Sequence, residues 1–232
     1  MAKIPKLKAI ERCDVDAQAT WEELFVLFET PEEERRKFIR RLKQLRVEKW
    51  NKELRIMELF CGRGSGLFAW ESLGFKNVEG VDISAELVNG YSGKAKCHVG
   101  DACSLPFADE SYDIVCIQGG LHHLNLTEEL DQALCEINRV LSSSGRLIVI
   151  EPWQTPFLWF VHFMMGIKLV RMLSKSVETY AKLCALERET LEAWLNHPKA
   201  ILEKLKLYNE TVTLRIGFGK LMFIGTCKKG VK

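Results

Sequence analysis

Several patterns that mark special classes of protein are missing from this sequence. It has no excess of either charge, because 33 lysines and arginines stand against 31 acidic residues and leave a net charge of +2. Proteins that hold nucleic acid electrostatically usually show a basic excess or a concentrated basic stripe. The one basic run, residues 35–46, is interleaved with apolar residues at helical spacing and is typical of a solvated helix face. We therefore expect no nucleic-acid partner.

A paired arrangement of cysteines is also missing. The eight cysteines are scattered, none forms a C-x-x-C pair, and some lie in apolar runs, as Cys116 does. This favours reduced thiols over a disulfide framework or a metal site, and a cytoplasmic protein over a secreted one. The first residues carry no apolar signal segment. The longest apolar run, residues 157–170, contains His162 and Lys168 and is too short to span a membrane.

The pattern of residues 1–50 predicts a helical extension. Thr20 is placed to cap a helix over 21–29, and Thr30 followed by Pro31 opens a second helix through about Val47. The apolar residues of this second helix recur every three or four positions, as an amphipathic helix requires.

Residues 51–232 follow a different pattern, in which short apolar runs alternate with helical stretches. We expect helices at 67–73, 84–91 and 126–141, the last capped by Thr127, and strands at 54–60, 78–83, 95–99, 112–117 and 146–150. This alternation predicts an α/β domain with a parallel sheet and helices on both faces. Residues 152–206 are mostly helical in pattern. Residues 208–218 and 220–228 predict a terminal hairpin, which would add one antiparallel strand.

The strongest local signal is a strand that runs into three alternating glycines, Gly62, Gly64 and Gly66, and then into a helix. Glycines let the backbone turn sharply and let a ligand approach where a Cβ would block it. Phosphate and dinucleotide sites use related loops, so this loop alone does not identify its ligand, although the missing G-x-x-x-x-G-K-[ST] excludes a nucleotide-hydrolysing P-loop. Glu58, near the end of the strand, is placed to accept from a ligand amine or to anchor the loop.

Two further carboxylates end the next two strands. Asp82 is placed to accept both hydroxyls of a ribose, and Ile83 beside it would offer an apolar face to a purine. Asp101, in Gly100-Asp101-Ala102, is placed to accept from an exocyclic amine such as that of adenine. Because ligands of parallel sheets bind beyond the carboxyl ends of the strands, three acids at three successive strand ends predict one site for an adenosine-containing ligand.

A family resemblance rests on motifs that occur in order: Glu58 to Gly66, Val81-Asp82-Ile83-Ser84, Gly100-Asp101-Ala102, Ser111-Tyr112-Asp113-Ile114-Val115, Leu121-His122-His123-Leu124 and Glu136-Ile137-Asn138-Arg139-Val140-Leu141. Together they resemble the class I S-adenosylmethionine-dependent methyltransferases of the "methyltransferase type 11" group, which includes quinone-biosynthesis enzymes. The resemblance covers about residues 54–151 and the terminal hairpin. It implies a Rossmann-like, seven-stranded, mostly parallel sheet with one antiparallel strand. The expected domain is 51–232, preceded by the helical extension 1–50 and containing a helical lid at 152–206.

The resemblance also implies S-adenosyl-L-methionine as the cofactor and a role for each motif. Glu58 and the loop through Phe60, Gly62 and Gly64 would hold the methionine part, Asp82 with Ile83 the ribose and purine, Asp101 with Ala102 the adenine amine, and Gln118 would face the methionine part or the acceptor. The family usually has glycine where Phe60 stands. The phenylalanine also resembles the opening motif of cytosine-C5 DNA methyltransferases, but these need a Pro-Cys nucleophile, and no proline precedes Cys116.

Methyl transfer from a sulfonium needs alignment more than elaborate catalysis. His122 and His123 follow the fourth strand and are the candidate general bases, with packing at a helix start as the alternative; Glu151 is a weaker candidate. The aromatic residues 157–165 line a pocket for a lipophilic acceptor, contact a membrane or a partner, or pack on the sheet. A small-molecule methyltransferase is the leading hypothesis. The alternatives are an RNA or protein methyltransferase and a non-catalytic S-adenosylmethionine-binding protein.

Overall fold

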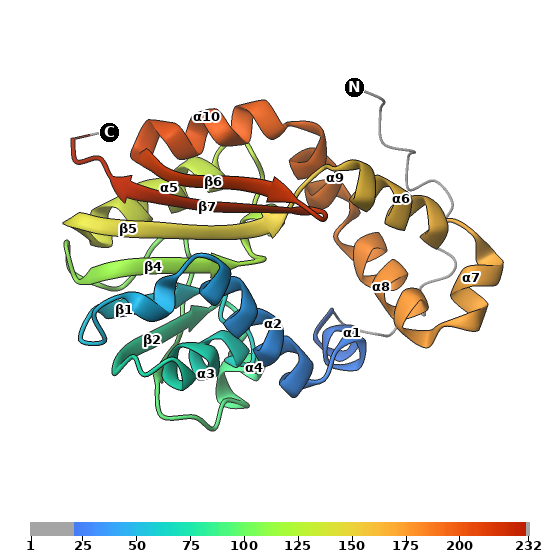
Figure 1. Cartoon of the computed structure of the whole chain (residues 1–232), viewed down its shortest axis with the longest axis horizontal. Helices are drawn as coiled ribbons and strands as arrows, with labels where there is room; N and C mark the ends of the chain where they lie inside the picture. Colours follow the sequence, from blue (N-terminus) through green and yellow to red (C-terminus); the bar gives the residue numbers. More distant parts are fainter. Residues whose placement is uncertain (1–20, 231–232) are drawn as a thin grey trace.

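A computed structural model of the chain describes residues 21–230, which form a seven-stranded sheet of order β3-β2-β1-β4-β5-β7-β6 (Figure 1). The neighbouring pairs among β1 to β5 are parallel, and β7 runs antiparallel to both β5 and β6. The predicted α/β fold with one antiparallel strand is therefore confirmed. The strands are β1 (Arg55–Leu59), β2 (Asn77–Asp82), β3 (Lys96–Val99), β4 (Tyr112–Gln118), β5 (Leu141–Pro152), β6 (Asn209–Gly217) and β7 (Lys220–Cys227).

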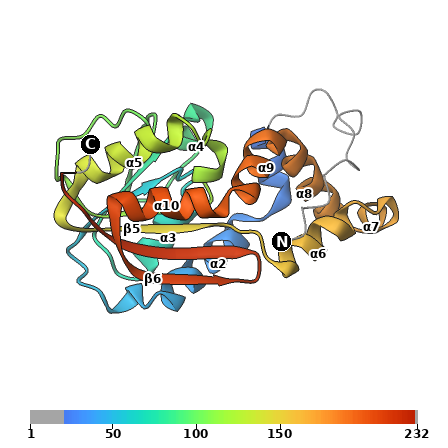
Figure 2. The same cartoon turned by 90° about the horizontal axis from the view of Figure 1, so that it is seen from above.

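Helices cover both faces of the sheet, because its central strands bury side chains on both sides. One apolar core joins β1, β4 and β5 to α5 and α10, and the other joins the opposite face of these strands to α2 and α3 (Figure 2). The helices are α1 (Trp21–Phe28), α2 (Pro31–Gln44), α3 (Ser65–Ser72), α4 (Ala85–Asn89), α5 (Glu129–Val140), α6 (Pro156–Met165), α7 (Lys168–Leu173), α8 (Lys175–Leu186), α9 (Arg188–Asn196) and α10 (Pro198–Tyr208), with short 3-10 helices η2 (Val47–Lys49) and η3 (Leu121–His123).

The helix starts largely follow the capping signals of the sequence. Thr30 caps α2 through a capping box with Glu33, and Pro31 occupies the first turn. Ser84 caps α4 by accepting from the backbone N–H of Leu87. Thr20 lies outside the described residues.

The region around α5 corrects two predictions. Thr127 does not cap α5; instead the side chain of Asn125 accepts from the backbone N–H groups of residues 127–129. The strand expected at 146–150 begins earlier, directly after α5, and β5 contains a bulge. Tyr112 pairs with Leu141 and Ile114 with Arg146, so β5 takes up extra residues at this point.

Helices α6 to α9 lie beyond the carboxyl ends of the parallel strands, beside α1 (Figure 1). The rings of Phe28 on α1 and Tyr180 on α8 stack with centroids 5.1 Å apart, which joins the N-terminal helices to the segment at 152–206. Among the described residues, no helix combines the length and apolar character needed to cross a membrane. The cysteines of this part of the chain are unpaired.

Candidate active site

One cavity of about 710 Å³ opens at the carboxyl ends of the parallel strands and is covered by α1, α2 and α8. Its wall brings together most of the residues that the sequence singles out: Phe60, Gly62, Asp82, Ile83, Asp101, Ala102, Gln118, His122 and His123. Glu58 and Gly64 do not line it. A cavity of this size and position is typical of a small-molecule site in an α/β protein.

Asp82 organises the edge of the cavity through both of its carboxylate oxygens. Oδ2 accepts from the backbone N–H of Gly62 at 2.7 Å, and Oδ1 accepts from the backbone N–H of Ser84 at 2.9 Å. The carboxylate thus fixes the glycine loop to the start of α4. Each oxygen can accept more than one hydrogen bond, so a ligand hydroxyl can still be bound.

The three glycines of the loop make room for different groups. Gly62 has a φ of +52° and faces the cavity, where a Cβ would meet only ordinary contacts. A Cβ on Gly64 would overlap the ring of Tyr91, and one on Gly66 would overlap the carboxyl of Glu58. Only Gly62 therefore gives a ligand direct access to the backbone, while Gly66 creates space for Glu58.

Glu58 lies under the loop and is 1% exposed. Burial raises the pKa of its carboxyl to about 8, so the group is mainly protonated and neutral at pH 7. This position fits the loop-anchoring alternative better than direct contact with a ligand amine.

Phe60 has a φ of 57°, in the left-handed region that favours glycine. The departure from the family pattern therefore occurs at a position whose backbone still has the conformation that suits glycine. A Cβ on Gly120 would overlap the ring of Phe60, so this ring lies directly against the Gly120 α-carbon. The phenylalanine is accommodated by a glycine on the neighbouring strand end.

The half of the cavity that carries Gly62, Asp82 and Asp101, the cofactor half, has further groups that a bound ligand would satisfy. Gln118 ends β4 and is buried, yet neither its Nε2 nor its Oε1 has a hydrogen-bond partner among the described residues. Ile83 is 72% exposed on the cavity wall. Asp101 accepts from the backbone N–H of Cys103 at 2.8 Å and is otherwise exposed. Unsatisfied buried amides are rare in proteins, so Gln118 fits a site for a ligand with polar groups.

The other half of the cavity, the acceptor half, lies around His122, His123 and Glu187 and contains a buried ion pair. Oε1 of Glu151 accepts from the backbone N–H groups of Gly120 and Leu121, both at 2.8 Å, while Oε2 lies 2.7 Å from Nδ1 of His122. Burial disfavours the charged form of His122, but the Glu151 and Glu187 carboxylates outweigh this and raise its pKa to about 9. His122 is thus an imidazolium at neutral pH.

His123 is in the opposite state. Burial and the positive charge of His122 lower its pKa to about 4, so His123 is neutral at pH 7. Its Nδ1 lies 3.8 Å from Oε1 of Glu187, and Nε2 of His122 lies 3.6 Å from Oε2 of the same residue. Of the two predicted bases, only His123 is in a protonation state that can accept a proton.

Several residues on the wall of this half are not among the predicted site residues: Lys37, Arg41, Tyr180, Glu187 and Lys220. No local motif marks any of them. The sequence does contain one weak signal, because Lys220 begins an otherwise apolar strand. Residues 157–165 are not on the cavity wall, and the side chains of Phe157, Phe160 and Phe163 are exposed. The segment 152–206 lines the cavity mainly through α8 and α9.

Comparisons with known proteins agree with the geometry. Residues 57–149 match the model of the family described as "Methyltransferase domain" of type 11. The chain is 29% identical over 161 residues to a demethylmenaquinone methyltransferase of Lactobacillus johnsonii, covering 66% of this chain and 64% of that enzyme. It is 28% identical over 206 residues to the demethylmenaquinone methyltransferase of Bacteroides fragilis, covering 82% of this chain and 75% of that one.

Solved structures of methyltransferases have the same fold. A crystal structure of an S-adenosylmethionine-dependent methyltransferase homologue from Methanococcus maripaludis, described as putative, superimposes with a TM-score of 0.65 at 12% identity, covering 92% of this chain and 97% of that one. The fold is that of a class I methyltransferase. Over residues 57–149 the chain is similar to the S-adenosylmethionine-dependent methyltransferases of the type 11 group, which indicates S-adenosylmethionine as the cofactor.

Proposed function

We propose that this chain transfers a methyl group from S-adenosylmethionine to a small, lipophilic acceptor. One observation carries the proposal: Gly62, Asp82, Asp101 and Gln118, from four neighbouring strand ends, line a single cavity. The demethylmenaquinone methyltransferases among the relatives are named for a lipophilic quinone acceptor, which supports the acceptor class. The rings of Phe28, Phe38 and Tyr180, which the covering helices α1, α2 and α8 place on the cavity wall, support it as well.

We assign the cofactor half of the cavity as follows. The Asp82 carboxylate binds the ribose hydroxyls and Ile83 packs on the purine, while Asp101 and Ala102 meet the adenine. The Gly62 backbone and the Gln118 amide bind the methionine part, and Phe60 closes the wall beside them. Gly64 and Glu58 act indirectly: Tyr91 covers Gly64, and the neutral carboxyl of Glu58 fills the space left by Gly66.

The other half holds the acceptor and moves its proton. When bound, S-adenosylmethionine would supply an electrophilic methyl group on its sulfonium. As the acceptor forms its bond to that methyl carbon, the electron pair of the broken carbon–sulfur bond would stay on sulfur. His123, neutral and on the cavity wall, accepts the proton of an acceptor that must lose one. His122, held by Glu151, stays protonated and orients η3. Helices α1 and α2, together with α8 of the lid, cover the cavity and exclude water.

Isothermal titration of the full chain with S-adenosylmethionine tests the cofactor assignment, and we expect saturable micromolar binding. A second titration uses Glu58→Gln, which keeps the shape and neutrality of this side chain and should bind equally well. Loss of binding in that variant would show that Glu58 contacts the ligand as a charged carboxylate. Release of S-adenosylhomocysteine in the presence of lipophilic phenols and quinols then tests catalysis. Binding without turnover on any acceptor would favour a non-catalytic cofactor-binding protein.

A further inference from the structure

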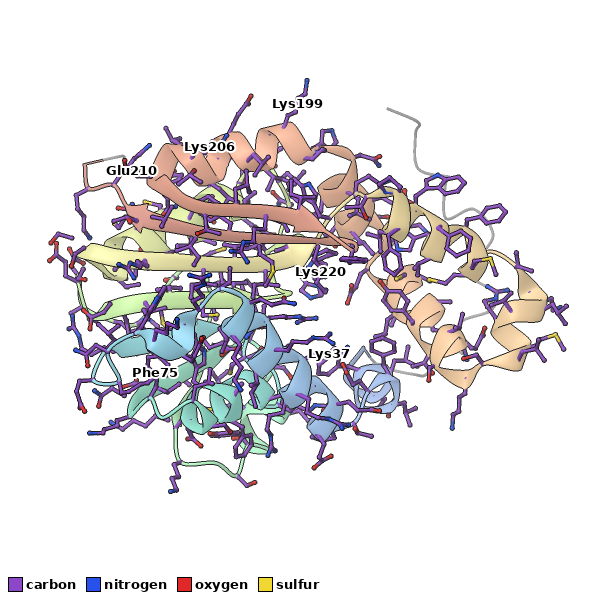
Figure 3. All side chains as sticks on the ribbon, viewed as in Figure 1. Lys37, Phe75, Lys199, Lys206, Glu210 and Lys220 are labelled. Carbon is purple, nitrogen blue, oxygen red and sulfur yellow. The ribbon has the colours of Figure 1, made fainter. Side chains whose placement is uncertain are left out.

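Two cations in the acceptor half have no polar partner among residues 21–230. Arg41 on α2 and Lys220 at the start of β7 both line the cavity, and neither forms a side-chain hydrogen bond or an ion pair there. The guanidinium of Arg41 lies 5.3 Å from the ring centroid of Phe38, a cation–π contact that gives its N–H groups no acceptor oxygen. Figure 3 shows Lys220 at the lid-side end of the sheet and Lys37 from α2 facing the same region.

The acids that lie nearest to these cations already have partners. Three pairs account for them: Glu29 with Lys37 at 2.6 Å, Glu34 with Arg63 at 2.8 Å, and Glu151 with His122 at 2.7 Å. Glu187, the remaining acid on this part of the wall, faces the two histidines. Because these three pairs are neutral, Arg41 and Lys220 stand against the single carboxylate of Glu187 and leave the acceptor half with a positive surplus.

The environment of Lys220 disfavours its charge while the cavity holds no anion. Loss of solvent lowers the pKa of its ammonium most, the cations Arg41 and Lys37 lower it further, and the carboxylates of Glu151 and Glu29 raise it without compensating. The resulting pKa is about 7. Uncompensated charges in a concave site are costly, and a bound anion would relieve this cost.

Aromatic side chains lie next to the two cations. Phe28 and Phe38 come from the N-terminal helices and Tyr180 from α8, and all three line the same cavity. A ligand that fills this space would need an apolar body for the rings and a negative group for Arg41 and Lys220.

We propose that the methyl acceptor is an amphipathic carboxylic acid, whose carboxylate is bound between Arg41 and Lys220 and whose apolar body packs on Phe28, Phe38 and Tyr180. The proposal rests on the proposed function, because it names the acceptor class of the same site. Arg41 can bind a carboxylate through two parallel hydrogen bonds, and Lys220 adds a point charge. β4 and β5 separate β7 from β1 and its glycine loop, so Lys220 lies on the acceptor side of the sheet.

The test compares two probes of equal shape on the full chain saturated with S-adenosylhomocysteine. Naphthalene-2-carboxylate carries the negative group, and naphthalene-2-carboxamide lacks it. We expect the carboxylate to bind about tenfold more tightly by isothermal titration, as hydrogen bonds between charged groups predict. Lys220→Met and Arg41→Met should each remove most of this preference. Lys199→Met, on the outer surface of α10, is the matched control and should keep it (Figure 3).

Proton uptake supplies an independent readout. Binding of the carboxylate at pH 7.5 should raise the pKa of Lys220 and draw protons from solution, so the binding enthalpy should depend on the ionisation enthalpy of the buffer. This dependence should disappear in Lys220→Met.

Equal affinity for the two probes, no binding of either, or an unchanged preference in both cavity variants would overturn the proposal. A loss of S-adenosylhomocysteine affinity in these variants with the probe preference intact would also overturn it, because the cations would then bind the cofactor's own carboxylate. Failure of the wild-type chain to bind S-adenosylmethionine would instead refute the proposed function.

Discussion

The two halves of the cavity are built in different ways. In the cofactor half, hydrogen bonds to backbone N–H groups hold the ends of neighbouring strands, as when Asp82 accepts from Gly62 after β1 and from Ser84 two residues further on. In the acceptor half, charged side chains meet from α2, β5, the start of α9 and β7. The cofactor half therefore depends on local backbone geometry, and the acceptor half on long-range packing that holds buried charges together.

The largest effect should come from the centre of the acceptor half. Glu151→Ala removes the carboxylate that accepts from Gly120, Leu121 and His122, and leaves the buried imidazolium of His122 without its partner. Breaking a buried ion pair in this way costs about 3–5 kcal/mol. We expect a decrease of this size in the free energy of unfolding, measured by urea denaturation. Glu110→Ala, whose exposed pair with Lys229 spans 3.7 Å, is the control and should change little.

A double-mutant cycle separates the ion pair from the backbone contacts. In a His122→Ala background, Glu151→Ala should cost clearly less, because no buried imidazolium remains. Equal costs in the two backgrounds would mean that His122 and Glu151 do not stabilise each other.

The same pair predicts a pH dependence of stability. The pKa of His122 is about 9 in the folded protein, where the carboxylates outweigh burial, and about 6.5 when unfolded. The stabilisation is therefore complete below about pH 6.5 and is lost as the pH rises toward 9, by about 3 kcal/mol at most. We expect the difference in free energy of unfolding between wild type and His122→Asn to decrease over this interval.

Lys220 also titrates in this pH interval, so its contribution to stability must be eliminated from the comparison. Its pKa is lowered to about 7 in the folded state, so its contribution has the opposite sign and stability rises with pH above 7. Both proteins should therefore carry Lys220→Met. A difference that stays constant from pH 6 to pH 9 would contradict the assignment of a protonated His122.

The contrast between the halves also explains how far the sequence predicts this site. The strand ends at Gly62, Asp82 and Asp101 could be located from the sequence because glycine spacing and strand–helix alternation are local patterns. Lys220 and Glu187 could not, because only the tertiary fold brings β7 and the lid to the end of β4. The predicted start of a helix was wrong where two side chains could cap it: Asn125, rather than Thr127, accepts from the backbone N–H groups at the start of α5.

In the cofactor half, Asp82→Asn should weaken S-adenosylmethionine binding. The amide can accept through one atom only, so it cannot accept from both the Gly62 and the Ser84 N–H groups, and it is an uncharged, weaker acceptor for the ribose hydroxyls. We expect the dissociation constant to rise by about tenfold to a hundredfold, the usual range for a hydrogen bond to a charged group. Titration calorimetry measures this, with the exposed Glu86→Gln of α4 as control. Unchanged affinity in Asp82→Asn would remove this carboxylate from the cofactor site.

The smallest effect concerns Phe60, where the halves meet. Its φ of 57° is strained for any residue with a Cβ, by about 1 kcal/mol relative to glycine. Phe60→Gly loses the ring contact with Gly120 but relieves this strain, so the net change in the free energy of unfolding should be about 1 kcal/mol or less.

The comparison with Phe60→Ala isolates the backbone contribution. Both variants lose the ring, but alanine keeps the left-handed strain, so Phe60→Ala should be less stable than Phe60→Gly by about 1 kcal/mol. At an ordinary backbone position the order is reversed, because glycine loses more conformational entropy on folding. Urea denaturation of the two variants decides this, and a more stable alanine variant would show that residue 60 does not adopt the left-handed conformation. Cofactor affinity should stay within about threefold of wild type in both variants, since Phe60 borders the proposed cofactor site but its side chain supplies none of the assigned polar contacts.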